Sequence, residues 1–228
     1  MKRRTLDVLF SAGGAVLAGL LLIVGIVLTS NASFANNYVH DQLSQQNITF
    51  KTADTLTPEE KDQACLVKYA GQKLTTGPQA ECYANHFIGV HLKAIEGGKT
   101  YSELGGVQAD LKAKIATAQK NNDIAAVADL NKQLTTVNAD RETVFKGETL
   151  RGLLLTSFGF SEFGRKAGQG ALVMYLAAGL LALLSIAGFS HAFVTPKNKA
   201  FAPVEPVNST DKGTDKGTDT GNRVLTNA

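Results

Sequence analysis

The stretch VLFSAGGAVLAGLLLIVGIVLT, residues 8–29, decides the fold because it is long, apolar and without charge. A helix that crosses the roughly 30 Å hydrocarbon core of a bilayer needs about 20 such residues, and it satisfies its own backbone hydrogen bonds there. Lys2, Arg3 and Arg4 precede the stretch, so residues 1–7 are expected to stay in the cytoplasm. The sequence therefore predicts a signal-anchor helix, and the chain after Thr29 is expected outside.

A cleaved signal peptide is the alternative interpretation of this stretch. Ser30, Asn31 and Ala32 form a small-x-small cleavage pattern. The apolar region of a signal peptide usually has about 7–15 residues, which is shorter than this run. A retained anchor is therefore the favoured interpretation.

A second uncharged run, ALVMYLAAGLLALLSIAGFSHAF, covers residues 171–193, and Lys197 and Lys199 follow it. A buried core helix is the alternative, but the length and the lack of polar residues favour a membrane span. Two spans and a basic N-terminus place both termini in the cytoplasm. Residues 30–170 are then an extracytoplasmic domain, and the fold class is mainly α with two transmembrane helices flanking that domain.

Cys65 and Cys82 both fall in the segment expected outside, where disulfides form and persist. The sequence therefore predicts a Cys65–Cys82 disulfide, with two free buried thiols as the alternative. The two cysteines do not form a CxxC motif, so no redox activity is indicated.

Two helix starts lie on either side of Cys65. Residues 57–60, TPEE, combine a Thr cap, a Pro at the first helical position and a Glu that completes a capping box. This helix is expected to continue to about Ala70. A second helix is expected to begin at residues 76–78, TGP, and to end at Gly97 and Gly98. An alternating segment, residues 48–52, could form a short strand.

An antiparallel helical hairpin with coiled-coil character is predicted over residues 103–146. Apolar residues recur there in steps of three, four and seven on both sides of the turn Asn121-Asn122-Asp123. Arg141 is expected to pair with Glu103 or Asp110 at the base of this hairpin.

Two further segments flank the second span. Residues 149–163, TLRGLLLTSFGFSEF, are apolar but interrupted, so they either lie in the membrane interface or pack beneath the extracytoplasmic domain. Residues 194–228 contain a DKGT repeat and few apolar side chains, which predicts a disordered cytoplasmic tail.

Composition and motifs restrict the chemistry of the 228-residue chain. Its net charge is +3 without a long basic run, so nucleic-acid binding is not indicated. The motifs of serine hydrolases, zincins, dinucleotide-binding folds and P-loops are absent. No catalytic residue and no cofactor is predicted.

A metal site is the one chemical alternative. Cys65, Cys82, His86 and His91 could form a zinc site, although their spacing does not match that of zinc fingers. An iron site would need two His and a carboxylate, for which the candidates are His86 and His91 with Glu81 or Glu96.

The chain apart from its tail resembles an uncharacterised bacterial family of two-span membrane proteins. The resemblance rests on residues 1–39, on FKTADTLTPEEK at residues 50–61, on the two cysteines and on KGETLRGLLLTSFGFSEFG at residues 146–164. Members are sometimes labelled aromatic ring-opening dioxygenases, which implies a soluble iron enzyme that acts on catechols. No catalytic motif comes with that label, so it assigns no site residue.

The first functional hypothesis is a non-enzymatic interaction or accessory protein of the cell envelope, with the hairpin as its contact element. Its expected partners are membrane lipid and another membrane or envelope protein. The alternatives are a metal-dependent enzyme or sensor using His86 and His91, and a component of a transporter. Two spans without a charged residue offer a transporter no evident ion path.

Overall fold

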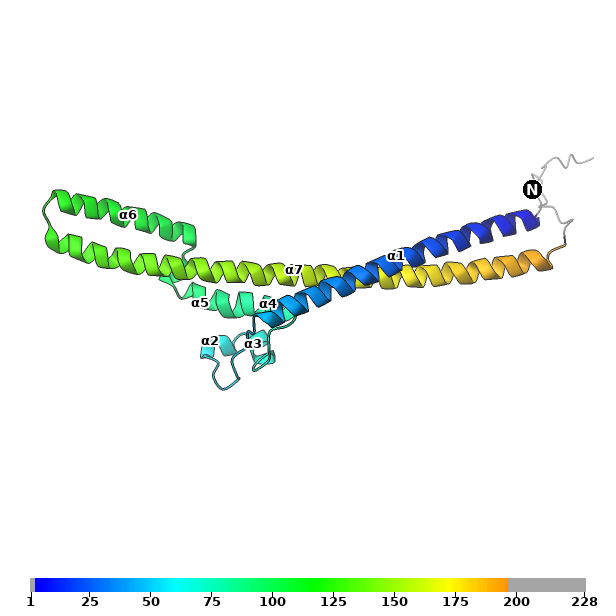
Figure 1. Ribbon diagram of the computed structural model, residues 1–228, viewed down its shortest axis with the longest axis horizontal. Coiled ribbons are helices and arrows are strands. Elements are labelled where there is room, and N and C mark those ends of the chain that lie inside the picture. Colours follow the sequence, from blue (N-terminus) through cyan, green and yellow to red (C-terminus); the bar gives the residue numbers. More distant parts are fainter. Residues whose placement is uncertain (1–2, 197–228) are drawn as a thin grey trace, which may run out of the picture.

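The computed structural model describes residues 3–196, and within them the chain is helical with no β-strand (Figure 1). The two longest helices run antiparallel, and the shorter ones lie at one end of that pair. The helices are α1 (Arg3–Gln45), α2 (Pro58–Lys61), α3 (Ala64–Lys68), α4 (Gly77–Cys82), the π-helical turn η1 (Tyr83–Ile88), α5 (Gly89–Lys93), the 3-10 turn η2 (Glu96–Gly98), α6 (Tyr101–Lys120) and α7 (Ile124–Val194). Apart from its first three residues, the expected tail, residues 194–228, lies outside the described part.

Helix α7 joins three segments that were expected as separate elements: the second hairpin arm, residues 149–163 and the second span. Its 71 residues contain no proline, so nothing removes a backbone hydrogen bond or clashes with the preceding turn. Asp123 caps the start of the helix by accepting the Ala126 N–H at 2.9 Å. At the 1.5 Å rise of an α-helix, α7 is about 105 Å long.

Helices α1 and α7 pack through small side chains. The buried positions of α1 recur every seven residues, and those of α7 do the same along its second span. This spacing keeps one stripe of each helix against its partner, and small residues allow the backbones to approach closely. The stripe of α1 contains Ser11, Ala18, Gly25, Ala32 and Val39, and that of α7 contains Ala171, Ala178, Ser185 and Ala192.

Polar contacts fix the register of the α1–α7 pair. The Thr29 and Tyr175 hydroxyls lie 3.0 Å apart, and Nδ1 of His191 lies 3.0 Å from Oδ2 of Asp7.

Both helices are long and apolar enough to cross a membrane. Their large apolar side chains face outward, for example Ile23 at 59% and Leu176 at 67% exposure, which is consistent with membrane association.

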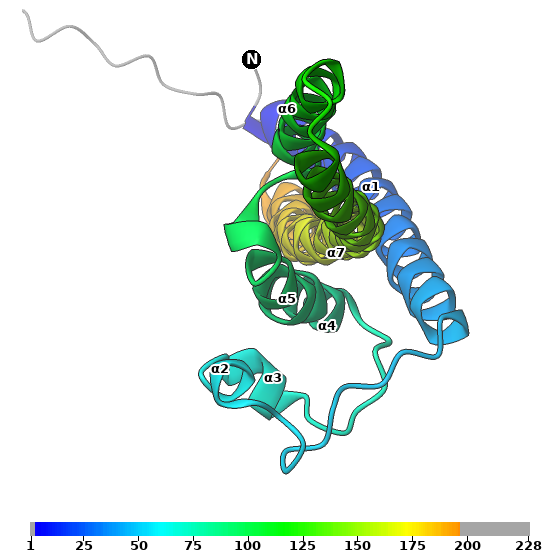
Figure 2. The same cartoon turned by 90° about the vertical axis from the view of Figure 1, so that its left-hand side faces the viewer.

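Residues 46–98 form what we call the disulfide lobe, which packs against α7 away from the spans. Figure 2 shows α4 and α5 next to α7, with α2 and α3 further out. The predicted capping box of Thr57 with Glu60 is present, and a second box, Thr76 with Gln79, lies at the start expected at residues 76–78. The helix expected over residues 58–70 is divided at Asp62 and Gln63 into α2 and α3, since Gln63 adopts an extended backbone.

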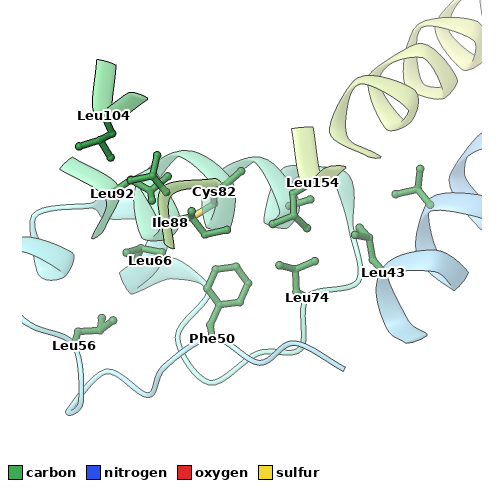
Figure 3. Close-up of a cluster of buried hydrophobic side chains, with 14 residues drawn as sticks. Leu43, Phe50, Leu56, Leu66, Leu74, Cys82, Ile88, Leu92, Leu104 and Leu154 are labelled. Carbon is green, nitrogen blue, oxygen red and sulfur yellow. The ribbon is translucent and has the colours of Figure 1, made fainter. Parts of the chain in front are cut away.

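The core of the lobe combines residues from its own helices with residues from the long helices (Figure 3). Cys65 and Cys82 form the predicted disulfide, with Sγ atoms 2.02 Å apart. The segment at residues 48–51 runs antiparallel to residues 71–74, and Phe50 N–H donates to the Gln72 carbonyl at 2.9 Å. This pairing amounts to one isolated bridge, Thr49 with Lys73, and not to the strand expected there. Buried core residues include Phe50, Leu66, Leu74, Cys82, Leu104, Val144 and Leu154.

Helix α6 and the first part of α7 form the predicted antiparallel hairpin, which extends beyond the lobe (Figure 1). The predicted apolar stripe is buried at Leu111, Ile115 and Ala118. Arg141 does not pair with Glu103 or Asp110 as expected. Its guanidinium carbon lies 4.0 Å from the centre of the Tyr101 ring, and its Nη1 donates to Oε1 of Gln108 at 3.3 Å. Glu103 instead caps α6 by accepting the Thr100 N–H at 2.7 Å.

Candidate functional site

The candidate metal ligands lie in the disulfide lobe, and each has another partner. The two cysteine sulfurs are bonded to each other. Nδ1 of His86 lies 2.6 Å from Oε1 of Gln63. Nδ1 of His91 donates to the Phe87 carbonyl at 2.7 Å.

The candidate carboxylates, Glu81 and Glu96, likewise contact other side chains. Glu81 accepts a hydrogen bond from Asn85 at 2.8 Å, and Glu96 lies 3.5 Å from Nζ of Lys99. Among residues 3–196, no three His, Cys, Asp or Glu side chains are grouped closely enough to hold a metal ion. The lobe therefore does not bring the sequence candidates together as one ligand set.

Glu60 is the centre of a polar cluster that connects three parts of the lobe. Its side chain is 1% exposed, and Oε1 lies 2.7 Å from Nζ of Lys51 and 3.5 Å from Nε2 of His91. Burial raises the pKa of the Glu60 carboxyl, but hydrogen bonds from Lys51 and the Thr57 N–H outweigh it, so the pKa lies below its usual value. Burial also raises the pKa of the nearby Tyr83 hydroxyl, and the negative charge of Glu60 adds to this effect.

The sequence signal for Glu60 was its place in a capping box, which does not reveal burial. Its contacts are those of a satisfied ion pair that holds the segment before α2, α2 itself and α5 together. We therefore interpret the Glu60 cluster as structural.

Arg151 of α7 lies against the π-helical turn η1. Its Nη2 donates to Oδ1 of Asn85 at 3.2 Å, and Nη1 lies 3.3 Å from Glu148. Its buried Nε has no hydrogen-bond partner in the described structure. Arg151 thus links α7 to the lobe.

An apolar groove of about 320 Å³ lies between the end of α1 and the middle of α7, and we call it the α1–α7 groove. Apolar side chains of residues 149–163 line one side of the groove. This run is part of the continuous helix α7. No Lys, Arg, Asp or Glu lines it. The lining residues are Tyr38, Val39, Gln42, Leu43 and Gln46 of α1, with Leu150, Leu153, Leu154, Thr156, Ser157 and Phe160 of α7.

The hairpin presents a different kind of surface. Lys112, Lys114 and Lys120 are exposed on α6. At the tip, Ile124 is 83% exposed. A long helical surface of this kind can contact another protein without a pocket.

No protein-family model, curated protein or solved structure matches the chain.

Proposed function

We propose that this protein is a membrane-anchored interaction or accessory protein of the cell envelope, and not an enzyme. The observation that supports this most is the continuity of α7, which runs from the second apolar run to the tip of the hairpin. The 47 residues from Ile124 to Gly170 correspond to about 70 Å of helix beyond the span at 1.5 Å per residue. Such a helix holds the hairpin far from the membrane surface.

The proposed topology places both termini in the cytoplasm and the lobe and hairpin outside. Antiparallel packing of α1 and α7 brings Asp7 next to His191, so the two helices end on the same side. Basic residues follow the same pattern in the sequence, with Lys2 before the first span and Lys197 after the second. The Cys65–Cys82 disulfide favours an oxidising compartment for the lobe.

The α6 face of the hairpin is the proposed contact surface for another envelope protein. It is remote from the lipid and carries three exposed lysines, Lys112, Lys114 and Lys120. Exposed lysines steer association through charge, and their reversal is expected to weaken binding of the partner.

Affinity capture of the tagged full-length protein from its membrane in mild detergent tests the proposal. The expected result is one reproducible partner, identified by mass spectrometry, whose recovery falls when the three hairpin lysines are changed to Glu. The matched control makes the same charge change in the lobe, at Lys61, Lys68 and Lys93. If the hairpin variant and the lobe variant recover the partner in equal amounts, the hairpin is excluded as the contact surface.

Metal analysis of the same purified protein separates this proposal from the enzyme alternative. Iron or zinc bound at one equivalent and lost in a His86→Ala/His91→Ala double variant would support the metal-dependent alternative. Recovery of the protein as a lone monomer or homo-oligomer would also overturn the accessory role.

A further inference from the structure

We propose that four exposed phenylalanines lie in the two head-group layers of the bilayer and set the depth of the α1–α7 pair. This inference rests on the proposed function, in which both helices cross the membrane. Among residues 3–196, the most exposed phenylalanines are Phe10, Phe34, Phe163 and Phe193, at 75%, 62%, 63% and 78%. Aromatic rings are typical of the boundary between hydrocarbon and head groups. Tyr38, a residue type enriched at that boundary, stacks on Phe34 with ring centres 5.9 Å apart.

The spacing of the four rings matches the thickness of a bilayer. Phe10 and Phe34 are 24 residues apart on α1, about 36 Å of helix. Phe163 and Phe193 are 30 residues apart on α7, about 45 Å. A bilayer has a hydrocarbon core of about 30 Å and a total thickness of about 40–45 Å. With each pair centred on the bilayer, the four residues lie about 18–22 Å from the midplane, within the head-group layers.

The two helices independently place the midplane at the same level. The residue midway between the two rings is Leu22 on α1 and Ala178 on α7. In the structure, Gly25 lies beside Tyr175, whose ring an added Cβ would approach to 2.7 Å. The helices run antiparallel (Figure 1), so three residues back from Gly25 corresponds to three residues forward from Tyr175. Leu22 therefore lies opposite Ala178, and the rings of both helices define one membrane level.

This level differs from the centres of the apolar runs, which are residues 18–19 and residue 182. The ring-defined level moves the chain by about 5–6 Å towards the cytoplasm. His191, which pairs with Asp7 at 3.0 Å, then lies about 20 Å from the midplane instead of about 14 Å. The ionisable pair thereby leaves the hydrocarbon, where charge is costly.

The same shift brings two cations to the lipid phosphates. Arg165 and Lys166 are exposed on α7, and they move from about 24–26 Å to about 18–20 Å from the midplane. Lipid surrounds the helix pair, so a cation on any face can meet a phosphate. The polar residues that reach the edge of the hydrocarbon, Asn31 and Gln169, are uncharged, and Asn31 Nδ2 donates to the Val27 carbonyl at 2.9 Å.

Quenching of single tryptophans by lipids with bromine near the acyl-chain ends tests the depth, because the protein contains no Trp. Leu176→Trp and Leu183→Trp are a matched pair, since both leucines are 67% exposed on α7. They lie about 3 and 8 Å from the ring-defined midplane, but about 9 and 2 Å from the centre of the apolar run. In vesicles of phosphatidylcholine and phosphatidylglycerol, the full-length Leu176→Trp variant is expected to lose more emission than Leu183→Trp.

Ile23→Trp and Val16→Trp repeat the comparison on α1, where these residues are 59% and 66% exposed. Ile23 lies about 2 Å from the ring-defined midplane and Val16 about 9 Å, so Ile23→Trp should lose more emission. Equal or stronger quenching at Leu183→Trp or at Val16→Trp overturns the proposed depth.

Removal of the outer rings tests whether they set this depth. In a Phe34→Ser/Phe163→Ser background, the chain is expected to move outward, and the difference in quenching between Leu176→Trp and Leu183→Trp should decrease. Phe145→Ser is the control, because it removes a ring of α7 that is 54% exposed but lies about 27 Å further out than Phe163. An undiminished difference without the outer rings would show that they do not anchor the protein.

Phe163→Trp identifies what covers the outer rings. Lipids that carry a nitroxide on the head group should quench this tryptophan and leave Phe145→Trp unquenched. No quenching of Phe163→Trp, as expected if a second copy or another protein covers the ring, overturns the inference.

The four reporters within the spans separate this inference from the proposed function. If brominated chains quench them but Leu183→Trp and Val16→Trp lose more emission, the chain crosses the membrane and only the ring-defined depth is wrong. If brominated chains quench none of them, the chain does not cross the bilayer and both proposals fail.

Discussion

Replacing Gly164 with Ala tests whether α1 and α7 pack as closely outside the spans as the structure shows. An added Cβ at Gly164 would lie 2.8 Å from the Cβ of Ala35 and 3.3 Å from the carbonyl oxygen of Ala32. The first distance is too short for two carbon atoms, and the nearest atoms are held by the helix backbone. The helices must therefore move apart.

The magnitude follows from two opposing effects. Overpacking costs about 1–3 kcal/mol, whereas Gly→Ala in a helix gains up to about 1 kcal/mol of helix propensity. Gly164→Ala is therefore expected to lose about 0–2 kcal/mol of unfolding free energy. Gly159→Ala meets nothing within 4 Å and is expected to gain up to about 1 kcal/mol.

Thermal unfolding of the purified protein in mild detergent, followed by far-UV circular dichroism, measures the difference between the two variants. A difference of about 1–3 kcal/mol corresponds to roughly 2–12 °C in Tm for a protein of this size. Gly168→Ala is an intermediate case, because its Cβ would meet Ala32 at an ordinary 3.7 Å. Equal Tm values for the Gly164 and Gly159 variants would refute the close approach of α1 and α7 at this level.

Three further predictions concern the lobe and the hairpin. The Cys65→Ser/Cys82→Ser double variant is expected to lose about 3 kcal/mol of unfolding free energy, the value for a loop of this length. Limited proteolysis should then cut the lobe first. Resistance of the lobe to protease equal to that of the unchanged protein would count against the stabilising role of the disulfide. Glu60→Gln is expected to cost about 1–3 kcal/mol of unfolding free energy at neutral pH. Because the folded-state pKa of Glu60 is lowered, this difference should persist above the ordinary carboxyl pKa of about 4.3 and shrink as the pH falls through the folded-state pKa. A difference in Tm that does not change with pH would contradict the ion pair. Arg141→Gln removes the cation above the Tyr101 ring and should cost about 0.5–1 kcal/mol, with faster amide exchange at the start of α6, whereas Arg141→Lys should retain part of the contact.

Helix starts and the hairpin were predictable because they depend on local residue chemistry. Thr57, Thr76 and Asp123 cap helices where the sequence places a side-chain oxygen before a helix start. The hairpin stripe was predictable because apolar periodicity reports one face of a helix. The pairing of Cys65 with Cys82 needed only that there are two cysteines in the chain.

The continuity of α7 was not predictable from local patterns. Gly147, Gly152 and Gly159 weaken a helix locally, and the apolar run at residues 149–163 was expected as an element separate from both the hairpin and the second span. In the structure, Gly147 lies against Leu92 of the lobe, where an added Cβ would be 2.6 Å from its side chain. That glycine allows the lobe to approach α7, so packing compensates for its low helix propensity.

The candidate sites, like α7, could not be predicted from local sequence patterns alone. The lining of the α1–α7 groove comes from residues 38–46 and 150–160, which are more than a hundred positions apart. Glu60 is a helix cap in the sequence and a buried ion-pair partner in the structure. Neither property can be read from one segment, because each depends on side chains that a distant part of the chain supplies.

The sequence by itself determined the two apolar runs, the helix caps, the hairpin and the available disulfide, since each follows from composition or from periodicity within one segment. Only the tertiary structure decided that α7 is a single helix, that α1 packs along it through Ala32, Ala35 and Gly164, and that Glu60 is buried against Lys51. The physical reason is that these features depend on contact between distant segments, where close packing and desolvation outweigh local preference.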